Sequence, residues 1–300
     1  MSVISIKQLK KYYGTHCGVE NVTFDVDEGE ILGFIGPNGA GKSTTIKLLL
    51  SLLKPDFGSA EIFGMDTRKD SAKIKENLGY VPGDVRYYPD MKVADLIDTT
   101  LRFHHKKPLE FRKARTDICD LFDIDLNKKF EELSLGNKKK VAIAQAIIHS
   151  PKLIILDEPT NGLDPLIQKY LFEHLQKMNR EGTTVLFSSH NLSEVETNCG
   201  RAAFIKDGQI IDMEDLTNNG HCAKEIYISL APGVEIVLPA KLSGASLLRT
   251  LPDGRITFQY KGDYPDLLAF LATLTPLDIT IENANLESRF LSYYEGGHKA

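Results

Sequence analysis

The sequence has few cysteines and no long apolar run, and each absence excludes a class of protein. The four cysteines are scattered and form no Cys-x-x-Cys pair, which fits free thiols in a reducing compartment better than disulfides or a zinc site. No apolar run approaches the roughly 20 residues of a membrane-spanning helix, since the best candidate, residues 46–53, contains Lys47 and ends at Lys54-Pro55. We therefore expect a chain that is not itself embedded in a bilayer and, because residues 1–6 enter a strand pattern directly, no signal peptide.

Positive charge is not in excess either. Lysine and arginine together number 36 against 41 aspartates and glutamates, a net charge of −5, whereas nucleic-acid binders present a basic surface. We expect no nucleic-acid partner. At 300 residues, with 42% hydrophobic and 26% charged residues, the chain has the composition of a globular protein and room for two domains.

A glycine-rich stretch stands between an apolar run, residues 31–35, and a helical pattern that begins at Thr45. Strand, glycine-rich turn and helix form the context of a phosphate-binding loop, in which backbone N–H groups and the helix dipole face an anion. Lys42 is then expected to reach the β- and γ-phosphates of ATP, and Ser43 to hold Mg²⁺. The alternative is a tight turn that is glycine-rich by chance. The stretch comprises Gly36, Pro37, Asn38, Gly39, Ala40, Gly41, Lys42, Ser43 and Thr44.

The order of apolar runs predicts an α/β fold, with strands alternating with helices in a mainly parallel sheet. Residues 1 to about 30 alternate as a small antiparallel β subdomain, with a hairpin turn at residues 28–30. Residues from about 84 to 150 carry helix patterns and are interpreted as an inserted helical subdomain. We predict one domain over residues 1–215 and a small α+β accessory domain over 216–300, with strands at 225–228, 234–238, 256–260 and 279–281 and helices at 267–271 and 286–294.

Two further runs end in residues suited to nucleotide hydrolysis. Asp157 closes the apolar run 153–157 and is assigned to the Mg²⁺ shell, because ligands of open α/β sheets bind at the carboxyl ends of strands. Glu158 follows as the base that orients or deprotonates water. His190, after the next predicted strand, is assigned to the γ-phosphate. A lone histidine after a strand is more often a core group; the order of glycine-rich loop, strand-Asp-Glu and strand-His is far more specific.

Two weaker candidates accompany these residues. Residues 133–137, Leu-Ser-Leu-Gly-Asn, precede a helix and predict either an anion site at its N-terminus or a plain capping turn with Ser134 as the cap. Tyr13 is placed to stack on an adenine ring, the alternative being a packed surface aromatic. Asp164-Pro165 predicts the start of a helix, with Asp164 as N-cap.

Together these motifs resemble the ATP-binding subunit of an ABC transporter over residues 1 to about 215. The resemblance identifies residues 36–44 as Walker A, 153–158 as Walker B, 161–164 as the D-loop with Asp164, and His190 as the switch histidine. It implies a P-loop NTPase core, ATP and Mg²⁺ as cofactors, and Tyr13 against the adenine. It also implies a head-to-tail dimer in which Ser134, Gly136 and Asn137 of the signature face the ATP of a second subunit.

The sequence departs from the family pattern at Gly83, where the family usually has a glutamine that contacts Mg²⁺ and the attacking water. Asp84 and a water molecule are the two candidates to replace it. We expect basal hydrolysis that is slow but present. The signature also reads Leu-Ser-Leu-Gly-Asn rather than Leu-Ser-Gly-Gly-Gln, yet Ser134 and Gly136 are kept.

The resemblance extends to partners. Asn137 and the C-terminal stretch 286–291 resemble the exporter-type branch whose membrane subunit is a separate chain. A multi-span permease is then expected to dock near Gly83–Phe103, with Tyr87, Tyr88 and Met91 as apolar contacts, unless these are subdomain core, and to hold the ATPase at the cytoplasmic face of the membrane. The alternatives are a non-transport ABC ATPase that acts on a soluble partner and a regulatory module that binds ATP without turnover.

Overall fold

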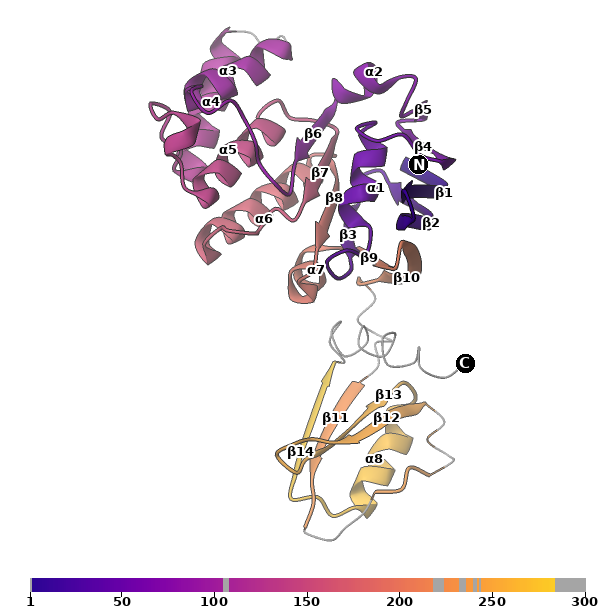
Figure 1. Ribbon diagram of the computed structural model, residues 1–300. Coiled ribbons are helices and arrows are strands. Elements are labelled where there is room, and N and C mark those ends of the chain that lie inside the picture. Colours follow the sequence, from indigo (N-terminus) through magenta and orange to yellow (C-terminus); the bar gives the residue numbers. More distant parts are fainter. Residues whose placement is uncertain are drawn as a thin grey trace. The chain divides into compact units, whose positions relative to one another are not determined.

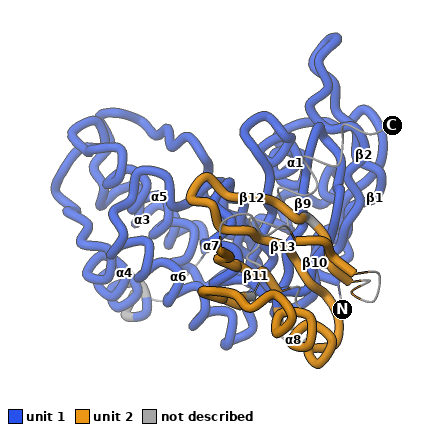
Figure 2. Tube along the Cα trace, turned by 90° about the horizontal axis from the view of Figure 1, so that it is seen from below, with its two compact units in different colours: residues 1–216 blue, residues 217–300 orange. Residues whose placement is uncertain are grey.

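The computed structural model describes residues 2–104, 108–217, 224–231, 236–239, 242 and 244–283. The chain separates into two compact units, residues 1–216 and 217–300, drawn in different colours in Figure 2. The first unit is built on a ten-stranded sheet with helices, and the second on a four-stranded sheet with one described helix. Among the described helices, none is both long enough and apolar enough to cross a membrane.

The first strands form the predicted antiparallel sheet. Their buried apolar residues, among them Ile4, Ile6 and Val22, alternate with exposed polar ones, the period-2 pattern of a strand with one face on the core. The turn at residues 28–29 is present, but the predicted hairpin is wrong: the strand after it pairs in parallel with two later strands instead. Its residues are buried almost throughout, as befits a central parallel strand. The antiparallel strands are β1 (Ser2–Tyr13), β2 (His16–Asp27), β4 (Phe57–Ile62) and β5 (Met65–Asp66).

The parallel strands provide the edge at which the motifs gather. Neighbouring strands run in the order β5-β4-β1-β2-β10-β9-β3-β8-β7-β6, and β3, β8, β7 and β6 are mutually parallel, so that their carboxyl ends meet at one edge. Two strands that the sequence did not indicate, β9 and β10, join this sheet to β2. The bounds are β3 (Ile31–Ile35), β6 (Leu78–Val81), β7 (Leu153–Asp157), β8 (Thr184–Ser189), β9 (Arg201–Lys206) and β10 (Gln209–Asp215).

Helices cover both faces of this sheet. Helix α1 (Lys42–Leu49) shares a core with the antiparallel strands and with β7 and β8, where Ile46 and Leu49 are buried. On the other face, Phe172 of α6 (Pro165–Arg180) packs 5.4 Å from Phe187, and Val195 of α7 (Leu192–Asn198) lies against Gly33. The short α2 (Ser71–Lys75) precedes β6.

The region after β6 is helical, as expected. Figure 1 shows its helices grouped together, apart from the antiparallel strands. Val93, Ile97, Leu101 and Phe122 are fully buried among them, which gives this region its own apolar packing. The elements are α3 (Val93–Phe103), α4 (Pro108–Phe122), the short 3₁₀ helix η1 (Phe130–Glu132) and α5 (Leu135–Ile147).

The second unit is a four-stranded antiparallel sheet in the order β12-β13-β11-β14, with α8 packed on it through Leu267 and Leu271. The predicted strand at 234–238 is wrong, because residues 236–239 are irregular, and β12 was not predicted. The sequences 286–294 and 286–291 lie outside the described residues. The elements are β11 (Lys224–Ser229), β12 (Ala245–Thr250), β13 (Ile256–Tyr260), α8 (Tyr264–Thr273) and β14 (Asp278–Asn283).

Candidate functional site

The glycine-rich loop connects β3 directly to α1, and its glycines are required by geometry. Gly39 and Gly41 adopt φ values of 84° and 109°, a region that side chains other than glycine rarely enter. A Cβ atom on Gly36 would lie 2.4 Å from the carbonyl oxygen of Ile205. The loop therefore folds back tightly on the sheet and leaves the N-terminus of α1 at the carboxyl edge of the parallel strands, a place that favours anions.

Lys42 is buried in this loop, with 5% of its surface exposed. Its ammonium donates to the carbonyl oxygens of Gly36, at 2.6 Å, and Pro37, at 3.2 Å. It also forms an ion pair with Glu158, with 3.1 Å between Nζ and Oε1. The positive charge is thus held at the mouth of the loop by one carboxylate and two carbonyls.

Glu158 is the centre of a cluster from three elements. Besides Lys42, its carboxylate contacts His190, with 2.6 Å between Oε2 and Nδ1, and accepts from Asn161 Nδ2 at 3.2 Å. Its φ of 48° is left-handed, a backbone conformation that is uncommon for residues other than glycine. The structure therefore brings together three residues assigned to hydrolysis from the sequence: Lys42, Glu158 and His190.

Asp157, one residue earlier, faces a different set of groups. It is 3% exposed, and its Oδ1 accepts from the hydroxyl of Ser188 at 2.8 Å. Its Oδ2 looks toward the loop after β6, where a Cβ atom on Gly83 would lie 3.3 Å away. Burial, together with this carboxylate, raises the pKa of the neighbouring Tyr80 to about 12, so the phenol stays neutral beside the acid.

A cavity of about 290 Å³ opens beside the glycine-rich loop. Tyr13, at the end of β1, is one of the residues that line it. His16 and Gly18, to which sequence reasoning gave no role, line it too, together with Asn161 of the predicted D-loop. Only spatial neighbourhood identifies His16 and Gly18, because β1 and β2 bring residues 13–18 to the loop. The lining comprises Tyr13, His16, Gly18, Pro37, Asn38, Gly39, Gly41, Lys42, Ser43, Thr44, Glu158 and Asn161.

The signature residues lie elsewhere in the chain. Ser134 is the N-cap of α5, and its hydroxyl accepts from the backbone N–H of Asn137 at 3.3 Å. In this structure Ser134 therefore caps the helix, which was one of the two alternatives predicted. Gly136 is pressed against the D-loop, since a Cβ atom there would lie 2.6 Å from the Gly162 carbonyl oxygen. None of these signature residues lines the cavity beside the glycine-rich loop; Asn137 lines a separate one with Leu133 and other residues of the helical region.

Three other predicted residues have roles that are local to their segments. Asp164 caps α6 by accepting from the N–H of Ile167 at 3.1 Å. Asp84 pairs with the exposed Arg86, with 2.6 Å between Oδ2 and Nη2. Tyr87 packs edge-on against Phe130, 5.1 Å between ring centroids, and so belongs to the packing of the helical region.

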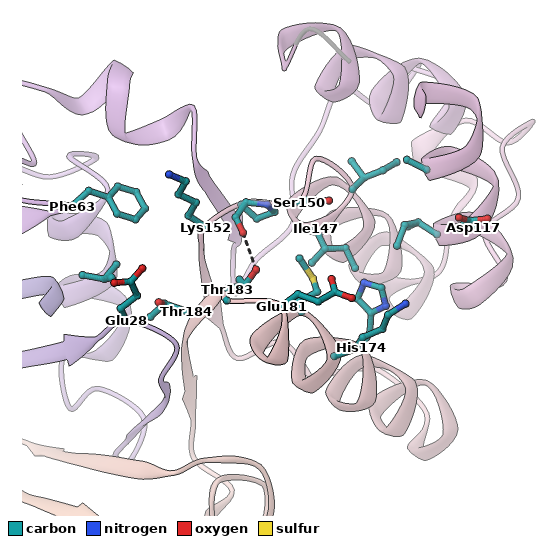
Figure 3. A pocket seen from close by; sticks show the side chains of 18 of the residues that line it. Glu28, Phe63, Asp117, Ile147, Ser150, Lys152, His174, Glu181, Thr183 and Thr184 are labelled. Atoms are coloured by element: carbon teal, nitrogen blue, oxygen red, sulfur yellow. Dashed lines mark hydrogen bonds between the residues drawn. The ribbon is translucent and has the colours of Figure 1, made fainter. Parts of the chain in front are cut away.

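The largest cavity described, about 970 Å³, lies at the opposite edge of the parallel strands (Figure 3). Lys152 and Thr184, at the amino ends of β7 and β8, line it together with His174 and Glu181. The hydroxyl of Thr183 donates to the Pro151 carbonyl oxygen at 3.0 Å. No residue of the glycine-rich loop and none of Asp157, Glu158 and His190 lines this cavity, so its size does not make it the site of chemistry.

Comparisons with known proteins agree with this geometry. The family model described as ABC transporter matches residues 19–161. The chain is 32% identical over 293 residues to "Uncharacterized ABC transporter ATP-binding protein YdbJ" of Bacillus subtilis (strain 168), covering 96% of this chain and 94% of that one. It is also 32% identical to "Linearmycin resistance ATP-binding protein LnrL" of the same organism, over 70% of this chain and 68% of that one.

Solved structures give the same result. The "Dimeric structure of a post-hydrolysis state of the ATP-binding cassette MJ0796 bound to ADP and Pi" matches with a TM-score of 0.66 and 26% identity, over 71% of this chain and 98% of that one. Fold, motif geometry and relatives thus agree. The chain belongs to the family of ABC transporter ATP-binding proteins, which are nucleotide-binding ATPases.

Proposed function

We propose that two ATPase subunits, two copies of this chain or this chain and a related one, close head-to-tail around ATP and that this closure powers an exporter. The nucleotide would lie between the glycine-rich loop of one copy and Ser134 and Gly136 of the other. What carries the proposal is that Lys42, Glu158 and His190 meet at one cavity, while the signature residues of the same chain lie outside it. A second subunit would place its own signature residues against the open side of this cavity.

Each residue of the cavity has a role in this proposal. The backbone N–H groups of residues 36–44 and the ammonium of Lys42 would bind the β- and γ-phosphates. Tyr13 would stack on the adenine. The ion pair between Lys42 and Glu158 would have to break when ATP binds, because the phosphate oxygens would take the place of the Glu158 carboxylate at the ammonium.

Ser43 and Asp157 would hold Mg²⁺, and their chemistry fits this ion. Mg²⁺ prefers oxygen ligands and takes one or two from the protein, with phosphates and water supplying the rest. Asp157 is a buried carboxylate whose Oδ2 faces the side-chain-free Gly83. When bound, the ion would neutralise charge on the phosphates.

Glu158 would act as the base that orients the attacking water, and His190 would donate to the γ-phosphate. In the structure His190 holds Glu158 through a 2.6 Å contact, so the histidine fixes the direction in which the carboxylate points. Loss of such a base typically lowers turnover by about 10²–10⁴. Asp164 would support this corner as the cap of α6, at the end of the D-loop.

The partner of the ATPase would be a multi-span membrane subunit that docks near Gly83–Phe103 and places the chain at the cytoplasmic face of the membrane. Tyr88 and Phe103 are 78% and 76% exposed in this stretch, which suits an apolar contact. The domain of residues 1–215 would be the motor, and residues 216–300 an accessory domain. The relative named for linearmycin resistance supports export as the direction.

The test is Glu158→Gln, which keeps the shape of the side chain and removes the base. We expect the variant to form an ATP-bound dimer in size-exclusion chromatography with ATP and Mg²⁺, and not with ADP. Glu173→Gln is the matched control, because Glu173 is an exposed residue of α6 that forms an ion pair with Lys169 at 3.8 Å, away from the cavity beside the glycine-rich loop. If Glu158→Gln stays monomeric at saturating ATP and Mg²⁺ with each candidate partner subunit, the sandwich mechanism is wrong.

A further inference from the structure

A second buried lysine lies next to the candidate site, and no motif accounts for it. Lys139, in α5, is 2% exposed. Its ammonium donates to the carbonyl oxygens of Pro82 and Gly83, at 3.0 Å each. A helix that begins at the signature is thereby tied to the loop after β6, more than 50 residues earlier in the chain.

Burying an ammonium is unfavourable unless carbonyls or carboxylates compensate for the lost water. Burial lowers the pKa of Lys139, and the carboxylates of Asp157, Glu158 and Asp84 oppose that shift. The geometry agrees, because the ammonium is hydrogen-bonded to the carbonyl oxygen of Gly83, the residue that borders Asp157. A position that served packing alone would be filled at lower cost by an apolar side chain.

Lys139 holds the loop that contains Gly83, the position at which this chain has no side chain. Gly83 lies directly beside Asp157, because a Cβ atom on it would be 3.3 Å from Oδ2. Glycine itself, however, brings no side-chain group to this carboxylate. The polar group that the structure does place against this loop comes from α5, one helical turn after Gly136.

We propose that Lys139 is a positioning residue for ATP hydrolysis, which locks Pro82 and Gly83 to the signature helix and holds a fixed positive charge on the loop that borders Asp157. The inference rests on the proposed function. In this role, Lys139 holds the loop of Pro82 and Gly83 in place beside Asp157. It also connects that loop to the start of the signature helix.

The two parts of this role have separable consequences. Loss of the tether frees the loop and lowers turnover, because two charge-assisted hydrogen bonds disappear. Loss of the charge leaves Asp157 with less positive charge nearby, so a divalent cation at Asp157 should bind more tightly. A lysine that serves only stability would produce neither a changed metal affinity nor a fall in kcat at constant KM.

The experiment compares Lys139→Met and Lys139→Gln in the full chain, with Lys140→Gln as the matched control from the same helix. ATPase kinetics give kcat and KM, and electron paramagnetic resonance gives the affinity of Mn²⁺ in the presence of ADP. For Lys139→Met we expect kcat to fall about tenfold with KM for ATP within about twofold, and Mn²⁺ affinity to rise about threefold or more. Lys139→Gln keeps a donor but no charge, so kcat should fall less while the rise in Mn²⁺ affinity stays the same.

Unchanged kcat and unchanged Mn²⁺ affinity in both Lys139 variants, with an active wild type, would overturn this inference and leave the proposed function standing. If the wild type hydrolyses no ATP with any of the candidate partner subunits, both this inference and the proposed function are wrong. Thermal melting shows whether each variant is folded, and if Lys139→Met does not fold, Lys139→Gln decides on the same criteria.

Discussion

Two buried lysines hold two loops at the carboxyl edge of the parallel strands, and they do so in different ways. Lys42 binds the carbonyls of its own loop, five and six residues before it. Lys139 binds the carbonyls of Pro82 and Gly83 from a distant helix. Lys42 also contacts Glu158 directly, whereas the hydrogen bonds of Lys139 go to backbone oxygens.

The difference indicates which of the two charges can change partner. Lys42 lines an open cavity, so an incoming phosphate can replace Glu158 at its ammonium without rearranging the fold. Lys139 lies between α5 and the loop after β6, and releasing it would separate two elements. One lysine is suited to bind and release a ligand, and the other to keep a loop in place.

The largest effect is expected from Lys42→Ala. Removing a charge that stabilises phosphate in a buried site typically costs a factor of about 10²–10³ in turnover, and nucleotide affinity should fall with it. Lys47→Ala is the control, because Lys47 lies on the same helix and is exposed. Binding of a fluorescent ATP analogue and steady-state ATPase rates measure both quantities. Unaltered affinity and turnover in Lys42→Ala would contradict the whole assignment of the glycine-rich loop.

The base-binding end of the cavity should respond less. Stacking on an aromatic ring contributes about 1–3 kcal/mol per base, so Tyr13→Ala should raise KM for ATP about tenfold with little change in kcat. Tyr13→Phe should resemble the wild type. Tyr12→Ala is the neighbouring control, since Tyr12 hydrogen-bonds Glu20 and does not line the cavity. Equal KM values for Tyr13→Ala and the wild type would leave Tyr13 as a packed surface aromatic.

Features of the fold and of the candidate site could be predicted from the sequence where neighbouring residues encode them. The glycine-rich loop, the Asp157-Glu158 pair and the Asp164 cap are encoded by neighbouring residues, and the structure has them in the expected strand and helix context. The hairpin at residues 28–30 was wrong because a turn signal does not say which strand the chain will join. The approach of β3 to β8 and β9 is decided by burial on both faces.

Long-range contacts were out of reach for the same reason. Lys139 sits in a run of three lysines, Lys138–Lys140, which by pattern predicts a solvated helix face. Only the fold reveals that the middle one points inward. In the second unit, the strand predicted at 234–238 has β-branched residues but, over 236–239, no ladder to join.

A smaller effect is expected from Gly83→Gln, which would return an amide to the loop that Lys139 holds. A single hydrogen bond contributes about 0.5–1.5 kcal/mol, so basal hydrolysis should rise about two- to tenfold, with an altered Mg²⁺ dependence. The new Cβ would lie 3.3 Å from Asp157 Oδ2, so the loop must shift slightly. Gly64→Gln is not a usable control because its φ is 70°; Lys140→Gln serves instead. An unchanged rate and unchanged Mg²⁺ dependence would remove this loop from the chemistry.

The smallest effect is expected from Asp84→Asn, which separates the two candidates for the task of the missing glutamine. The carboxylate of Asp84 is 68% exposed and pairs with Arg86, itself 86% exposed. An exposed ion pair of this kind contributes between zero and about 1 kcal/mol, and the carboxylate is already turned toward the arginine. We therefore expect less than a twofold change in kcat and in Mg²⁺ dependence, measured beside Lys139→Met. A fall in kcat as large as that of Lys139→Met would show that Asp84 moves into the site during turnover. The proposal that Lys139 holds this loop in place would then be wrong.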